Sequence, residues 1–296
     1  MLRRIAFARR GILRRLWTVV RRVAAESNED RLLGLAAETA FFAVLSIFPG
    51  LLIAAGLLSV LDVFVGADLA AGAREQVVSA LDLLLTEEAS GAVASVEALF
   101  AESRGSLLTF ATLGALVTLS GAFGVVINAL NLAYDTAERR SWLRRRLLGL
   151  AMGVATMVAV VLALAVLVVG PFLGKGADLA DLVGLGPVFT FAWDVLRVPV
   201  LFAGLVLWAA ALFHFAPSDH PGWRACLPGA LATAVLWIVA SLGFHLYLAV
   251  VAGGNPVLGA FGGGVIVMTW VYLLSLGLLL GGELNATLAR SGRRVR

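Results

Sequence analysis

Six apolar blocks, each long enough to cross a lipid bilayer, constrain this chain more than any other feature. About 20 helical residues span the roughly 30 Å hydrocarbon core of a membrane. The blocks cover approximately residues 32–61, 106–134, 147–171, 188–215, 226–252 and 257–288. Charged residues make up only 14% of the 296 positions, against about 25% in soluble domains. The sequence therefore predicts an all-α, polytopic membrane helical bundle with about six transmembrane helices.

The placement of arginine predicts how this bundle is oriented. Nine arginines lie in residues 1–31, five in residues 139–146 and four in residues 290–296. Lys and Arg are retained on the cytoplasmic side of membrane proteins. We therefore predict a multi-pass protein of the inner (plasma) membrane with both termini in the cytoplasm. Its domains are a basic segment 1–31, a six-span membrane domain 32–288 and a basic tail 289–296.

Two regions outside the predicted spans have their own pattern. Residues 1–31 repeat paired arginines between apolar residues, which predicts a basic amphipathic helix on the inner leaflet. Residues 62–105 form an acidic extracytoplasmic insertion whose apolar spacing predicts short amphipathic helices. We expect membrane lipids with anionic headgroups as partners. The charge placement argues against nucleic acid, and a homo-oligomer stays open.

The sequence lacks the motifs of soluble enzymes. The single cysteine, Cys226, excludes an intramolecular disulfide and every multi-cysteine metal motif. The three histidines do not have metal-ligand spacing, and no nucleotide-binding Gly-Lys-Ser/Thr loop is present. We therefore expect no catalytic residue, no metal site and no cofactor.

Ionisable and amide residues inside the predicted spans are the candidate site, because such groups are costly in a membrane and are often functional. An inner layer near the cytoplasmic side is predicted, with His214 beside it. We interpret it as a polar vestibule in which Glu38 or Glu283 contacts a substrate or couples a proton. The alternative is that these groups only hydrogen-bond between helices and fix their register. The candidates are Glu38, Asn128, Asn131, Tyr134, Glu283 and Asn285.

An outer layer is predicted in the opposite half of the membrane. Asp194 and Arg197 are three residues apart and are expected to form a local ion pair. His245 is expected to make an interhelical hydrogen bond. The glycines at 262–264 permit either close packing or a break in the last span that exposes backbone groups.

Four motifs, in order along the chain, carry a family resemblance. They are Ala37 to Pro49, Asn128 to Tyr134, Leu227 to Ala230 and Gly282 to Ala286. With these motifs the sequence resembles the YihY/BrkB family of integral membrane proteins, which also carries a ribonuclease BN-like label. The resemblance implies an inner-membrane protein with six helices. It also suggests transport or export of an envelope lipid or another amphiphile.

We expect a transporter or exporter of a small or amphiphilic, lipid-like envelope substrate. The alternative is a non-transporting scaffold or regulatory factor of the cell envelope, which acts through residues 62–105 and the basic N-terminal helix. A membrane-associated ribonuclease is disfavoured, because a metal-dependent nuclease needs clustered carboxylates near a basic groove.

Overall fold

A computed structural model describes residues 17–46, 105–172, 186–251 and 257–293. All regular secondary structure in these ranges is helical, which confirms the predicted all-α class for the described part of the chain. A helix over 17–29 precedes the bundle. The bundle helices are α2 (Leu32–Leu45), α6 (Gly105–Ala133), α7 (Trp142–Phe172), α9 (Gly186–Phe215), α10 (Trp223–Val251) and α11 (Val257–Arg293). Residues 1–16 and residues 62–104 of the predicted insertion lie outside the described residues.

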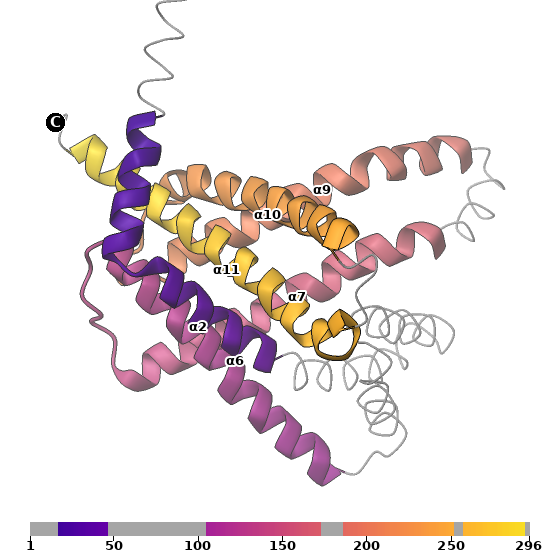
Figure 1. Cartoon of the computed structure of the whole chain (residues 1–296), viewed down its shortest axis with the longest axis horizontal. Helices are drawn as coiled ribbons and strands as arrows, with labels where there is room; N and C mark the ends of the chain where they lie inside the picture. Colours follow the sequence, from indigo (N-terminus) through magenta and orange to yellow (C-terminus); the bar gives the residue numbers. More distant parts are fainter. Residues whose placement is uncertain (1–16, 47–104, 173–185, 252–256, 294–296) are drawn as a thin grey trace, which may run out of the picture.

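The contacts between the bundle helices close into a ring. In Figure 1, α11 runs between α2 and α10, and it contacts both. Each helix packs against the next one along the chain, and α11 returns to pack against α2. The last helix, α11, also contacts α6, so it touches α2, α6 and α10. Residues on α11 are therefore placed to connect several elements at once.

Three helices in the described part are long and apolar enough to cross a membrane. They are Val195–Phe215, Trp223–Tyr247 and Gly264–Ser291. Their outward faces carry exposed apolar side chains, among them Leu207 and Leu246. Such surfaces mark contact with lipid or another partner rather than with water. The helices thus support a membrane protein, whereas the six crossings and their orientation stay predictions.

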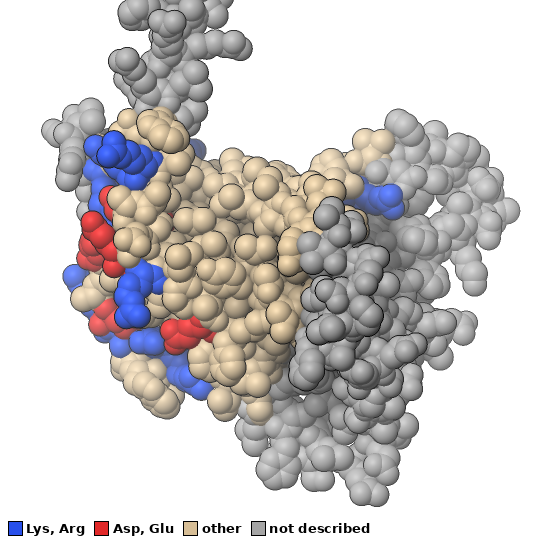
Figure 2. Space-filling model, in the orientation of Figure 1, with Lys and Arg blue, Asp and Glu red and all other residues tan. Residues whose placement is uncertain are grey.

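Charged side chains gather at one end of the molecule, and an uncharged band lies next to them (Figure 2). This charged end holds the helix over 17–29, the loop 134–141, the loop 216–222 and the last turns of α11. Arginine and glutamate alternate there in close proximity, which indicates ion pairing rather than a single-sign surface.

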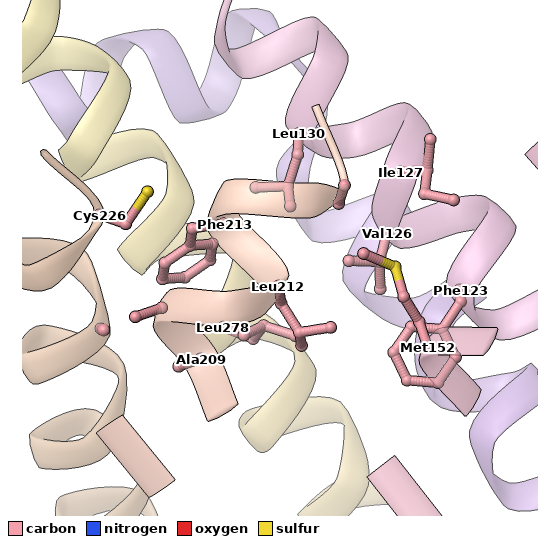
Figure 3. Close-up of a cluster of buried hydrophobic side chains, with 13 residues drawn as sticks. Phe123, Val126, Ile127, Leu130, Met152, Ala209, Leu212, Phe213, Cys226 and Leu278 are labelled. Carbon is pink, nitrogen blue, oxygen red and sulfur yellow. The ribbon is translucent and has the colours of Figure 1, made fainter. Parts of the chain in front are cut away.

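The hydrophobic core lies in the half of the bundle next to the charged end. Phe213 is fully buried and packs with Leu130, Leu212, Cys226 and Leu278, so side chains of α6, α9, α10 and α11 meet there (Figure 3). In contrast, Val198 and Val200 on the other half of α9 are exposed. The tight packing fixes how the connecting loops of the charged end lie relative to one another.

Glycines bring α10 and α11 into close contact. A Cβ added at Gly281 would lie 2.6 Å from the carbonyl oxygen of Gly229 and would overlap the Thr233 hydroxyl. Small residues at a crossing allow two backbones to approach. In contrast, residues 262–264 lie inside α11, which is one helix from Val257 to Arg293. The alternative of a broken last span is therefore wrong.

Candidate functional site

Arg290, in the last turns of α11, joins three separate parts of the charged end. Its guanidinium pairs with Glu26 from the helix over 17–29, with Asp135 just after α6 at 2.8 Å and with Glu283 at 2.9 Å. It also donates to the carbonyl of Ala133 at 2.8 Å. We call Glu26, Asp135, Glu283 and Arg290 the Arg290 junction.

Local backbone geometry places these groups. Glu283, Thr287 and Arg290 follow at intervals of four and three residues, so they lie on one face of α11. The Thr287 hydroxyl donates to the Glu26 carboxylate at 2.7 Å, which extends the contact along this face. Asp135 has a φ of 52°, a left-handed conformation that ends α6 and that Asp tolerates better than most residues.

Glu283 is the most deeply buried member of the junction. Its side chain has 0% exposure, and Oε1 accepts a hydrogen bond from Arg290. Its second oxygen, Oε2, has no hydrogen-bond donor among the described residues. A buried polar group without a partner costs about 1–3 kcal/mol, so native proteins rarely keep one without a reason.

Three further buried polar atoms at this end also lack a partner in the described part of the chain: Tyr134 Oη, Ser27 Oγ and Arg290 Nε. They come from the segment after α6, the helix over 17–29 and α11. These are the same three elements that meet in the junction. This concentration makes the junction the strongest candidate site in the structure.

Two carboxyls at the charged end, Glu26 in the junction and Asp30 beside it, differ in their pKa. Burial raises the pKa of Glu26, but hydrogen bonds from Thr287 and Arg290 outweigh burial and bring it below its usual value. Burial and the nearby Asp135 carboxylate raise the pKa of Asp30. Glu26 is therefore a stable carboxylate, whereas Asp30 binds a proton more readily than an ordinary aspartate.

A second network connects the loop after α6 to the loop after α9. Asn131 donates to the Glu138 carboxylate at 2.9 Å and accepts from the Ser218 backbone N–H at 2.8 Å. The Ser218 hydroxyl donates to Glu138 at 2.9 Å. Arg140 donates to the carbonyls of residues 215, 216 and 217, which complete the end of α9. We call Asn131, Glu138, Arg140 and Ser218 the loop clamp.

Asn285 on α11 forms hydrogen bonds to the backbone of α10. Its amide donates to the Cys226 carbonyl at 3.0 Å and accepts from the Gly229 backbone N–H at 2.7 Å. The side chain is 1% exposed, and both of its polar atoms are satisfied. Asn285 therefore fits the alternative in which polar groups fix helix register.

The structure thus places the residues of the predicted inner layer in different contacts. Tyr134 and Glu283 belong to the junction region, Asn131 to the loop clamp and Asn285 to the α10–α11 crossing. Glu38 on α2 and Asn128 on α6 have exposed side chains and are not members of either network. Within the described residues, no group of three or more His, Cys, Asp or Glu side chains is arranged to hold a metal ion.

The remaining predicted groups lie elsewhere. Nδ1 of His214 is 2.6 Å from the Pro221 carbonyl oxygen, and its ring stacks on Trp223. His245 is exposed on α10. Asp194 and Arg197 lie on α9, but the side chain of Asp194 is outside the described part, so their ion pair stays a prediction.

Arg290, Glu26 and Asp135 were not among the predicted site residues. In the sequence, Arg290 is one of the arginines that predict the orientation in the membrane. Glu26 and Asp135 look like ordinary charged residues outside the candidate site. The spacing of Glu283, Thr287 and Arg290 on one helix face is the signal that would have pointed to Arg290. No local pattern points to Glu26, which is 264 residues away from its partner.

Residues 23–296, which include the whole junction, match the family described as Virulence factor BrkB. The chain belongs to this BrkB family. It is 31% identical over 252 residues to the ribonuclease-like protein YfkH of Bacillus subtilis (strain 168), covering 85% of this chain and 88% of that protein. The predicted resemblance is confirmed.

Other BrkB-family relatives carry names of membrane proteins. The chain is 28% identical over 175 residues to the UPF0761 membrane protein Ent638_4092 of Enterobacter sp. (strain 638). It is 29% identical over 175 residues to the UPF0761 membrane protein YihY of Salmonella newport (strain SL254). Each match covers 58% of this chain and 59% of the relative. No solved structure matches the chain.

Proposed function

We propose that this BrkB-family protein is a transporter or exporter of a small or amphiphilic, lipid-like envelope substrate. In this proposal the charged end faces the cytoplasm, and the Arg290 junction is the polar site at the entrance to the bundle. The proposal includes no catalytic step. The observation that carries it is the fully buried Glu283 carboxyl, whose Oε2 has no donor in the described residues.

The cost of this arrangement supports a functional role. Removing a carboxylate from water costs several kcal/mol, and well-packed apolar residues of similar volume are often at least as stabilising. Packing alone therefore gives no reason for Glu283 at the end of an apolar helix. The junction also joins three elements through one side chain, so a change at Arg290 would alter how all three are held.

Interfacial side chains support a membrane–water boundary at the charged end. Trp142 and Leu143, at the start of α7, are 77% and 57% exposed. Arg145 and Arg146 extend along α6 and donate to the carbonyls of residues 124 and 117. Aromatic belts and arginines that reach along a helix are typical of the membrane–water interface. We propose that this region contacts anionic lipid headgroups of the inner leaflet.

Mass spectrometry of the lipids and small molecules retained in native membrane discs tests the proposal. We expect enrichment of one amphiphile over the bulk membrane with the wild-type protein. The enrichment is lost in Glu283→Gln and kept in Glu29→Gln, which removes an exposed carboxylate at the same end. A retained set equal to bulk lipid in all three proteins would contradict transport of an amphiphile.

One observation favours the scaffold alternative. The helix over 17–29 has exposed Trp17 and Val20 side chains, which are available to a partner. Deleting residues 1–25 removes both but leaves Glu26 in the junction. A transporter that still inserts should keep its retained amphiphile after this deletion, whereas a scaffold that acts through this helix should lose its envelope phenotype.

A further inference from the structure

We propose that Glu283 is a proton-binding site, which holds a proton in the structure described here and releases it when the Arg290 junction rearranges. The inference deepens the proposed function, on which its role in transport rests, because it names the proton as the coupled ion. Three observations carry it: the charge balance of the junction, the unpartnered oxygen of Glu283 and the groups that surround this oxygen.

The junction has three carboxyls and one guanidinium, so two negative charges are left without a cation of their own when all three carboxyls are ionised. Three carboxyls contact the single guanidinium of Arg290. The side chains of Glu26 and Asp135 are 30% and 76% exposed, so water stabilises their charges. Glu283 is 0% exposed and has no access to water. A buried carboxyl in this position becomes neutral by binding a proton, because its ionised form is the least stabilised of the three.

The two oxygens of Glu283 fit a protonated acid. Oε1 accepts from Arg290 at 2.9 Å, as the carbonyl oxygen of a carboxylic acid can. Oε2 has no donor among the described residues, and the carboxyls of Glu26 and Asp30 interact with Glu283. Carboxylates are acceptors only, so these neighbours repel an ionised Glu283. In this assignment, a protonated Glu283 donates a hydrogen bond to one of these carboxylates instead of repelling it.

The titratable groups near Glu283 come from several elements. Glu26 and Asp30 come from the N-terminal segment, and Tyr134 and Asp135 follow α6. Cys226 opens α10 beside Tyr134, and Arg290 belongs to α11 itself. Within the described residues, the exposed Glu38 on α2 forms no hydrogen bond or ion pair with the junction. The described surroundings of Glu283 are thus mostly acidic, which favours its neutral form.

The proton can reach water through Glu26, whose side chain is 30% exposed. When Glu283 releases the proton, the O–H bond at Oε2 breaks and a new O–H bond forms on the Glu26 carboxylate, which then passes the proton to water. Burial raises the pKa of Glu26, whereas hydrogen bonds lower it, and one of these involves Glu283. The ionised Glu283 then competes with Glu26 and Asp135 for Arg290. Proton release thereby loosens the helix over 17–29 and the loop after α6.

Infrared difference spectroscopy of the purified full chain in lipid discs tests this assignment. A buried, protonated carboxyl has a C=O stretching band that is distinct from the bands of carboxylates. We expect this band in the wild-type protein at mildly acidic and neutral pH, with loss of intensity as the pH rises. It is absent in Glu283→Gln and unchanged in Glu29→Gln. An identical band in wild type and Glu283→Gln, or no such band at any pH, would overturn the proposal.

A second variant keeps the test valid even when Glu283→Gln does not fold. Glu283→Asp keeps an acid at this position, so the band should shift in frequency rather than disappear. An unshifted band in Glu283→Asp would show that it belongs to another carboxyl and would overturn the assignment.

These outcomes are independent of the transported substrate. A Glu283 band without any retained amphiphile would support the proton site and contradict the proposed function. Amphiphile retention that depends on Glu283, without an infrared band from Glu283, would support the proposed function and contradict the proton site.

Discussion

Glu283 and Arg290 lie two turns apart on α11, and Arg290 Nη2 bridges the buried Glu283 carboxyl to Glu26 on the N-terminal helix. A single guanidinium nitrogen therefore connects the buried Glu283 on α11 to the helix over 17–29. The contact holds the helix over 17–29 against the end of α11, although the two elements lie at opposite ends of the sequence.

Removing this connection should destabilise the protein. Arg290→Ala deletes the donors to Glu26, Asp135, Glu283 and the Ala133 carbonyl. Hydrogen bonds to charged groups contribute about 1.5–3 kcal/mol, so we expect a loss of about 2–3 kcal/mol in the free energy of unfolding. Thermal unfolding in detergent measures the loss. Arg290→Lys, which keeps the charge, should retain part of the stability, and equal losses in both variants would contradict an electrostatic role.

Asn285 should contribute to stability without contributing to a binding site. Asn285→Leu leaves the Cys226 carbonyl and the Gly229 N–H without their side-chain partner, at a cost of about 1–3 kcal/mol. The matched variant Asn128→Leu changes an exposed amide and should stay within about 0.5 kcal/mol. Denaturant unfolding of both variants checks this difference, and similar costs would place Asn128 in an unrecognised contact.

The close approach of α10 and α11 should not tolerate a larger residue. Gly281→Ala forces its methyl group against Thr233 and the Gly229 carbonyl, so the helices must separate, and overpacking of this kind costs about 1–3 kcal/mol. Gly264→Ala is the control on the same helix, because its Cβ meets nothing within 4 Å. The control should be neutral or stabilising, since Ala favours helix over Gly by about 1 kcal/mol.

The loop clamp should weaken in acid. Burial raises the pKa of Glu138, but hydrogen bonds from Arg140, Ser218 and Asn131 outweigh it and hold the pKa below 4.5. The unfolded chain therefore takes up the proton first, so the stabilisation is present above pH 4.5 and is lost as pH falls through the folded-state pKa. Comparing the unfolding of wild type and Glu138→Gln across this range tests the effect, and parallel pH curves would contradict it.

The predicted orientation can be checked with introduced cysteines. Cys226 is buried, and Cys226→Ser provides a background without cysteine. In this background, Glu29→Cys should resist a membrane-impermeant maleimide in intact cells and react in inverted vesicles. Labelling in intact cells would reverse the proposed orientation of the charged end.

Local sequence was sufficient to predict the approximate bounds of α9 and α10. The block predicted at 188–215 corresponds to α9 (Gly186–Phe215), and the block at 226–252 corresponds to α10 (Trp223–Val251). Both limits follow from turn-forming residues next to apolar runs, which act within a few residues. Sequence could not separate Asn128 from Asn131, because residues three apart share a helix face. Only the neighbouring helices decide that Asn131 is buried and Asn128 is exposed.

The sequence by itself determined the helical class, the membrane setting and the BrkB family, and it named Glu283 as a candidate, because hydropathy and charge are properties of short segments. Only the tertiary structure decided that Glu283 meets Arg290, Glu26 and Asp135, and that Glu38 does not join them. These contacts depend on how α11 closes the ring against α2 and α6. Helix rotation and long-range packing set that closure, and no local pattern encodes them.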